Sequence, residues 1–236
     1  MSFSKDRREP ISHMQFPWKI HAHLDVLFDG NGKPVPFSSS ATLISRSYAI
    51  TAGHSLYIPE AMAVAYKVSR DPKEIKFSLG VSEGKTEYPV SVISFMIHPK
   101  WISDESPHYD YALLRLETHI GDEAGHASLM AFETASLLNT EVNVTGYPAD
   151  KLVNGFPQMY TMPGPVKHVG DKKFYYDIDT SGGQSGSGVW AFDAEKKNVL
   201  CCGIHTTGYP TANGAVRVTD EVIKEIEKWI EHLHAN

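Results

Sequence analysis

The sequence predicts an all-β fold that ends in one amphipathic helix. Short apolar or alternating segments recur through the first 218 residues, and such segments are typical of β-strands. Glycine, proline, asparagine and aspartate separate these segments, as turns require. The last stretch changes to helical spacing. Many short strands divided by turns are typical of β-barrels and β-sandwiches.

The predicted strands follow one another from residue 21 onwards. The segment 21–28, HAHLDVLF, alternates polar and apolar residues and meets the hairpin-type turn DGNG. The next stretch, 40–54, contains two short strands divided at Arg46 and Ser47. Further strand signals lie at 88–98, 111–117, 141–147, 174–180, 188–193, 199–206 and 214–218.

The spacing of apolar residues predicts a helix over 219–234, with Thr219 as its N-cap. Its apolar face comprises Val222, Ile223, Ile226, Trp229, Ile230 and Leu233. The segment 119–137 shows neither helical nor strand period and is interpreted as a linker. We therefore expect an N-terminal arm and a first β unit in 1–118, and a second β unit with the helix in 138–236.

Composition excludes several classes of protein. The chain has 236 residues, 42% hydrophobic and 21% charged, and a formal charge of −6. This charge gives no basic footprint for nucleic acid, and no apolar run is long enough to span a membrane. The start, MSFSKDRREP, shows no export signal, so we expect either the mature form of a secreted protein or a cytoplasmic one.

The segment 180–190, TSGGQSGSGVW, places Ser185 among glycines directly before an apolar strand. A glycine-rich turn explains the glycines alone. A backbone whose N–H groups point inward around a serine nucleophile explains both the glycines and the apolar strand that follows, because glycine permits positive φ angles. Gly183 and Ser185 are then the candidate donors of two N–H groups to one oxyanion. The nucleophile elbow G-x-S-x-G is excluded, because position 187 is serine.

A serine nucleophile needs a general base, and the base needs an orienting acid. His54 ends the strand-like stretch AITAGHS, where small residues surround it. Asp110 begins DYALLRL at the edge of an apolar strand, which favours a shielded carboxylate. The other seven aspartates between His54 and Ser185 lie in more polar or turn-like settings, or within a strand signal. The order is histidine, aspartate, serine.

TAGH, DYALLRL and GQSGSGVW, in this order within an all-β chain, resemble the chymotrypsin-like serine peptidases. More narrowly, TGYPAD, YYDIDTSGGQSGSGVW and GIHTTG resemble the bacterial glutamyl endopeptidases. The resemblance implies two antiparallel six-stranded β-barrels, the trypsin-like fold, with the cleft between them. It implies that His54 is the base, Asp110 its orienting acid and Ser185 the nucleophile.

The resemblance also leaves two specificities to weigh. Thr180 and His205 match the positions that hold a substrate carboxylate in glutamyl endopeptidases, whereas Asp179 lies where trypsin-like enzymes place the acid for lysine or arginine. A hydroxyl and an imidazole donate to a carboxylate, and neither neutralises a guanidinium. We therefore expect cleavage after glutamate, with aspartate slower. The family further implies that the amine near Ser2 contributes to substrate binding.

We expect neither a cofactor nor a metal. His21 and His23 share one face of a strand, but no third ligand accompanies them. The expected partners are proteins or peptides with acidic residues, bound by a monomer. A catalytically silent protease-fold binding protein and an esterase with the same triad stay open as alternatives.

Overall fold

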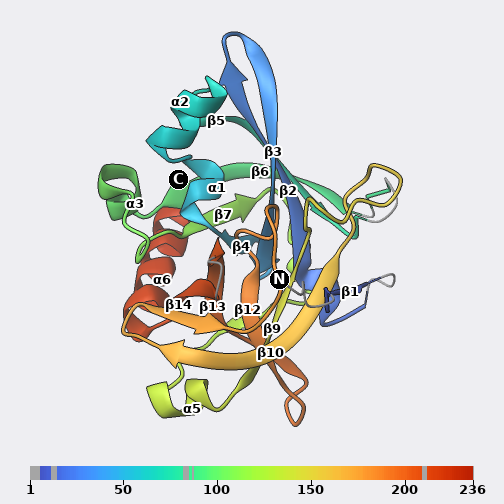
Figure 1. Ribbon diagram of the computed structural model, residues 1–236, viewed down its shortest axis with the longest axis vertical. Coiled ribbons are helices and arrows are strands. Elements are labelled where there is room, and N and C mark those ends of the chain that lie inside the picture. The colour runs from blue at the N-terminus through green and yellow to red at the C-terminus, as the bar shows by residue number, and fades with distance from the viewer. Residues whose placement is uncertain (1–5, 12–14, 82–84, 87, 209–211, 236) are drawn as a thin grey trace, which may run out of the picture.

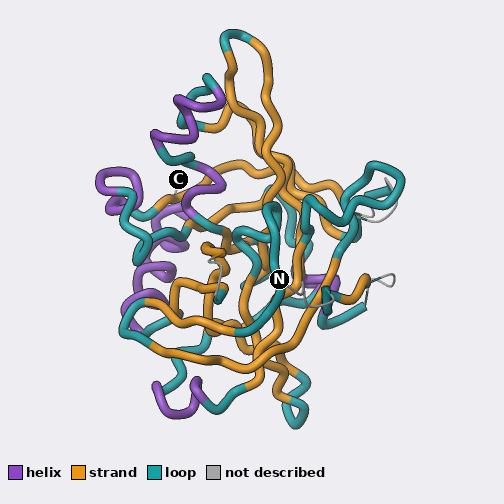
Figure 2. Tube along the Cα trace, in the orientation of Figure 1, coloured by secondary structure: helices purple, strands orange, loops and turns teal. Residues whose placement is uncertain are grey.

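Two closed antiparallel β-barrels of six strands each make up most of the protein (Figures 1 and 2). The computed structural model describes residues 6–11, 15–81, 85–86, 88–208 and 212–235. The predicted all-β fold with two six-stranded barrels and a terminal helix is confirmed. Figure 2 shows the helical segments around the strand framework.

The first barrel has the strand order β2-β3-β4-β7-β6-β5. The predicted hairpin turn lies between β2 and β3, where Asn31 and Gly32 take φ angles of 55° and 83°. The break predicted at Arg46 and Ser47 separates β3 from β4. The strands are β2 (His21–Gly30), β3 (Lys33–Leu43), β4 (Tyr48–Thr51), β5 (Pro72–Leu79), β6 (Tyr88–Ile97) and β7 (Ala112–Leu116).

The second barrel closes because β9 pairs with both β10 and β12. Outside the ring, β1 (Glu9–Pro10) pairs with β10, and β8 (Ser128–Leu129) runs parallel to β13. The strands in closed order are β9 (Glu141–Gly146), β10 (Tyr160–Val169), β11 (Lys173–Tyr176), β14 (Asn213–Arg217), β13 (Asn198–Gly208) and β12 (Gly188–Asp193).

The strand predictions missed two barrel strands and made a third too long. The sequence pattern did not reveal β5, which carries three charged residues, or β10, which contains two prolines. The predicted strand 174–180 is too long, because β11 ends at Tyr176 and the chain then leaves the sheet. Short helices occupy the connections: a 3-10 turn (Trp18–Ile20), α1 (Gly53–Leu56), α2 (Glu60–Tyr66), α3 (Pro99–Asp104), α4 (Gly121–Ala124) and α5 (Thr134–Leu138).

The predicted terminal helix is confirmed as α6 (Asp220–Ala235). The Val222 amide donates to Thr219 Oγ1 at 3.3 Å, so Thr219 caps the helix as expected. The buried face consists of Val222, Ile226, Trp229 and Leu233. This face packs against β6 and β7 of the first barrel (Figure 1). The helix therefore ties the end of the chain back to the first barrel, while the predicted boundaries at 118 and 137 stay predictions.

Candidate active site

His54 and Asp110 meet at one end of the first barrel. His54 lies in α1, directly after β4, and Asp110 precedes β7, the strand that pairs with β4. Their pairing brings both side chains together: His54 Nδ1 lies 2.7 Å from Asp110 Oδ2, and the His54 amide donates to Asp110 Oδ1 at 2.8 Å. Asp110 is 4% exposed. The carboxylate thus fixes both the ring and the backbone of His54.

The surroundings of this pair set the pKa of His54. Burial disfavours the imidazolium, but the charge of Asp110 and its hydrogen bond outweigh burial, so the pKa of His54 is raised above its ordinary value. The Trp101 ring lies 6.1 Å from the imidazole, between ring centroids. A Cβ at Gly53 would meet Trp101 at 3.0 Å and Asp110 Oδ1 at 3.1 Å, so Gly53 packs tightly against both side chains.

Ser185 lies on the loop between β11 and β12, and β3 of the first barrel holds that loop. The Ser185 carbonyl accepts from the Ser40 amide at 2.8 Å and from Ser39 Oγ at 2.7 Å. The Gly183 carbonyl accepts from Ser40 Oγ at 2.8 Å. A Cβ at Gly186 would meet Thr51 Oγ1 at 2.2 Å, so the loop packs against the segment that leads into His54.

The backbone amides of the Ser185 loop differ in whether they have a hydrogen-bond acceptor. The N–H groups of Gln184, Gly186 and Ser187 donate to carbonyls of Ser181, His205 and Gln184. Among the described residues, the N–H groups of Gly183 and Ser185 have no such acceptor. Gly183 takes a φ of +91°, where a side chain is strained, and a Cβ there would lie 2.4 Å from the Tyr147 carbonyl. The two predicted donors are therefore among the amides of this loop that have no acceptor in the described part of the chain.

His205 lies on β13, against the loop of Ser185. Its carbonyl accepts from the Gly186 amide, and its amide donates to the Ser187 carbonyl, each at 2.8 Å. The ring is buried, and His205 Nδ1 lies 2.6 Å from the Tyr176 hydroxyl. Burial and the positive charge of His54 lower the pKa of His205 to about 3. The imidazole is consequently neutral at physiological pH, and Tyr176 is a supporting residue that the sequence did not single out.

Asp179 and Thr180 belong to the segment between β11 and the Ser185 loop. The Asp179 carboxylate accepts three hydrogen bonds from Arg7, from the amide at 3.0 Å, Nε at 3.3 Å and Nη2 at 3.2 Å. Burial disfavours ionised Asp179, but Arg7 outweighs it and holds the pKa below its ordinary value. Thr180 is half-buried. Ser2 lies outside the described residues.

Lys173 is a buried cation that sequence reasoning missed. Its ammonium donates to Thr206 Oγ1 at 3.2 Å and Thr207 Oγ1 at 2.6 Å, directly after His205. Its side chain forms no ion pair with the described carboxylates. Burial lowers the pKa of Lys173, and the charge of Asp110 opposes this effect. In turn, its positive charge lowers the pKa of His54. The available sequence signal was a pair of lysines, Lys172 and Lys173, before the aromatic run FYY.

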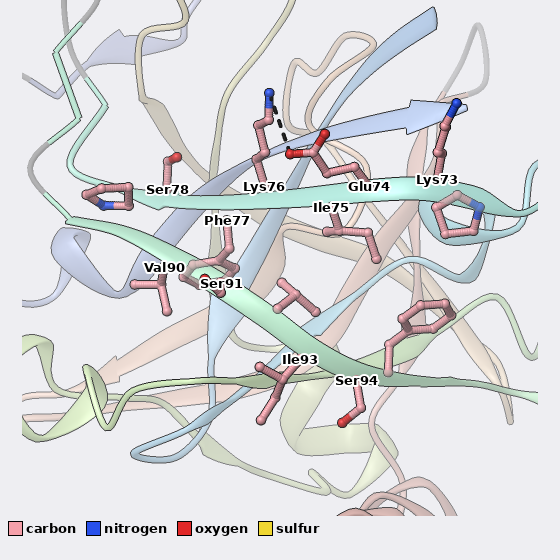
Figure 3. A pocket seen from close by; sticks show the side chains of 14 residues that line it. Lys73, Glu74, Ile75, Lys76, Phe77, Ser78, Val90, Ser91, Ile93 and Ser94 are labelled. Atoms are coloured by element: carbon pink, nitrogen blue, oxygen red, sulfur yellow. Dashed lines mark ion pairs between the residues drawn. The ribbon is translucent and has the colours of Figure 1, made fainter. Parts of the chain in front are cut away.

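The remaining candidate features lie apart from this site. His21 Nδ1 pairs with Thr42 Oγ1 and His23 Nε2 with Ser38 Oγ, each at 2.9 Å. The described part of the chain contains no group of three metal-binding side chains. None of its helices is long and apolar enough to cross a bilayer. An open groove of about 610 Å³ lies along β5 and β6, and none of the candidate site residues lines it (Figure 3).

Known proteins share this architecture. The glutamyl endopeptidase of Bacillus licheniformis is 26% identical over 237 residues, covering 96% of this chain and 67% of that protein. A protein of Bacillus subtilis named extracellular metalloprotease is 25% identical over 226 residues, covering 95% of this chain and 68% of that protein. The solved structure of a Glu endopeptidase in complex with MPD covers 97% of this chain and 98% of its own, with a TM-score of 0.79 and 24% identity.

The family model named Trypsin matches residues 9–230, which include both barrels and the candidate site. The fold, the paired His54 and Asp110 and the glycine-flanked Ser185 agree with that match. The chain therefore belongs to the trypsin family of serine peptidases and is a hydrolase.

Proposed function

We propose that this protein is a serine endopeptidase in which Ser185 is the nucleophile. The observation that carries the proposal is the hydrogen bond between His54 Nδ1 and Asp110, 2.7 Å long, beside the loop that presents Ser185. Asp110 accepts a hydrogen bond from His54 Nδ1–H, which keeps the proton on Nδ1 and leaves Nε2 as the acceptor for the serine proton. The base and its acid come from the first barrel and the nucleophile from the second.

The reaction then proceeds in two halves. Ser185 Oγ attacks the peptide carbonyl carbon while His54 Nε2 takes the hydroxyl proton, and the developing oxyanion faces the amides of Gly183 and Ser185. Collapse of this intermediate breaks the C–N bond, and His54 returns the proton to the leaving amine. Water, activated by the same histidine, hydrolyses the acyl-enzyme and restores Ser185.

Ser185→Ala should lower kcat/KM for peptide hydrolysis by at least about a thousandfold, because losing the nucleophile leaves only residual catalysis. Ser187→Ala is the matched control, since this neighbouring hydroxyl is buried without a partner in the described structure. Circular dichroism should show both variants folded. Retention of more than about a tenth of wild-type activity in Ser185→Ala would exclude Ser185 as nucleophile.

Lys173 provides a test of the charge balance around His54. Activity requires neutral His54, so it falls as pH drops through the raised pKa of this histidine. Lys173→Met removes a cation that lowers this pKa, and the acid limb of kcat/KM should move to higher pH. The ratio of kcat/KM at pH 6 to that at pH 8 should fall at least about twofold.

Lys172→Met is the matched control for that measurement, because Lys172 pairs with Glu221 at 2.9 Å. Its pH profile should match the wild type. An unchanged acid limb in Lys173→Met would show that this lysine does not act on the base.

We further propose cleavage after glutamate, with Thr180 and His205 as donors to the substrate carboxylate. Neutral His205 still donates one N–H, and Tyr176 fixes the ring from Nδ1. The alternative, lysine or arginine specificity through Asp179, is less favoured because Arg7 already occupies that carboxylate. Aspartate is expected to react more slowly because its shorter side chain fits the donors less well. The glutamyl endopeptidase relative supports the same choice.

A peptide library with varied residues before the cut tests this specificity. Wild-type protein should prefer glutamate, and His205→Ala should lose at least about tenfold in kcat/KM for glutamate relative to a neutral residue. His168→Ala, an exposed histidine on β10, is the control and should keep the preference. A preference for lysine or arginine would instead identify Asp179 as the residue that binds the substrate side chain.

A serine-reactive fluorophosphonate separates the proposed peptidase from its alternatives. Labelling of Ser185 together with peptide cleavage supports the peptidase. Turnover of esters alone supports an esterase, and an unlabelled folded protein supports a silent binding protein.

We propose that the amine near Ser2 lies close to the specificity pocket and attracts an acidic side chain. The support is the course of the N-terminal arm, since Arg7 is bonded to Asp177 and Asp179. Protein with a free Ser2 amine should show higher kcat/KM for a glutamyl substrate than protein with a short N-terminal extension. Equal values would remove this role.

We also propose a monomer that is secreted and acts on proteins or peptides with acidic residues. The relative named extracellular metalloprotease supports an extracellular place. A cytoplasmic location is the alternative, and fractionation of cells that produce the protein distinguishes the two locations.

A further inference from the structure

Arg8 lies at the junction between the N-terminal arm and the loop of Ser185. Its side chain is only 4% exposed, which is unusual for an arginine. The arm is anchored behind it: β1 pairs with β10, and the Ile11 amide donates to the Met159 carbonyl at 2.9 Å. Arg8 therefore has a fixed position against the second barrel.

The guanidinium makes contacts that converge on the segment before the nucleophile. Arg8 Nη1 donates to Ser181 Oγ at 3.1 Å, to Gln184 Oε1 at 3.2 Å and to Asp150 Oδ1 at 3.0 Å. Arg8 Nη2 donates to Asp150 Oδ2 at 2.6 Å and to Asp6 Oδ2 at 2.7 Å. Ser181 Oγ also donates to Asp150. Arginine suits this place because its planar fork presents five donors.

Gln184 is the residue through which this contact reaches the proposed oxyanion donors. It stands between Gly183 and Ser185, and its side-chain oxygen accepts both from Arg8 and from the Ser181 amide, at 3.0 Å. The Gln184 amide donates to the Ser181 carbonyl at 3.2 Å. Arg8 thus stabilises the tight turn 181–184 through Ser181 and Gln184. The amides on either side of Gln184, those of Gly183 and Ser185, have no acceptor among the described residues.

The charges around Arg8 balance. Asp6 and Asp150 carry two negative charges, and Lys151 Nζ lies 2.9 Å from Asp6 Oδ2, so two cations face two anions. Hydrogen bonds from Arg8 hold the pKa of both carboxyls below their ordinary values. The cluster therefore keeps its charges over the pH range in which a serine peptidase works.

We propose that Arg8 is a positioning residue for catalysis: it holds the turn 181–184 so that the amides of Gly183 and Ser185 point toward the oxyanion. This inference rests on the proposed serine chemistry. It gives the N-terminal arm a role through an internal side chain, separate from any role of the chain's terminal amine. The effect should appear in kcat rather than in KM, because the oxyanion exists only after attack.

The test compares Arg8→Gly with wild type, with Arg46→Gly as the control. Arg46 forms an exposed pair with Asp122 and contacts none of the loop residues. Arg8→Gly should lower kcat at least about tenfold, a part of what losing one oxyanion donor costs, with KM changed less than about threefold. Added methylguanidine should restore kcat at least about threefold in Arg8→Gly and leave wild type unchanged, because it refills the same site.

Two readouts separate this inference from the proposed function. Fluorophosphonate labelling of wild-type Ser185 tests the function before any variant is made. Amide hydrogen exchange over 177–190 tests the positioning without turnover, and Arg8→Gly should exchange faster there than wild type. Wild-type kcat and exchange in Arg8→Gly would overturn the inference.

A second variant tests the inference if Arg8→Gly cannot be obtained as a folded protein. If Arg8→Gly does not fold, Arg8→Lys decides, since lysine keeps the charge but cannot reproduce the fork. A lower kcat in folded Arg8→Lys supports the inference, and wild-type kcat overturns it. A folded Arg8→Gly that loses kcat without rescue by methylguanidine also counts against it.

Discussion

The candidate active site depends on the contact between β3 of the first barrel and the Ser185 loop of the second. Ser39 and Ser40 supply an amide and two hydroxyls to the carbonyls of Gly183 and Ser185. Because each peptide unit is planar, fixing these carbonyls also fixes the amides of Gln184 and Gly186, the residues on either side of Ser185. The hydroxyl of Ser40 also accepts a hydrogen bond from the Tyr147 amide at 3.0 Å, so β3 holds both the Ser185 loop and the end of β9.

This contact brings the candidate site residues of two separate barrels together. His54 and Asp110 are aligned by the pairing of β4 with β7, and Ser185 by hydrogen bonds across the barrels. Helix α6 adds a second contact between the two halves of the chain, since it begins after β14 and packs on the first barrel. The proposed triad thus relies on pairings between segments far apart in the chain, and its geometry is only as rigid as those contacts.

The sequence predicted the elements with a clear period and the residues with a clear chemical context. Helix α6 and the β2–β3 turn were predictable because apolar spacing and the NG dipeptide act locally. Strands β5 and β10 were not, because charge and proline hide the alternation, and their barrel partners decide their conformation. Lys173 and Arg8 were missed for a similar reason: their burial follows from distant hydroxyls and carboxylates, which no local pattern shows.

The overall charge of the protein bears on the proposed selection of an acidic substrate. A formal charge of −6 gives a long-range field that opposes an acidic peptide. At physiological salt this field is screened within about 8 Å, so groups in direct contact with the substrate decide its preference. His205 is neutral, and Arg7 and Arg8 are paired with aspartates. Lys173 differs from them because its described hydrogen-bond partners are neutral hydroxyls. Its charge lowers the pKa of both His54 and His205, so the same cation acts on the proposed base and on a proposed donor to the substrate carboxylate.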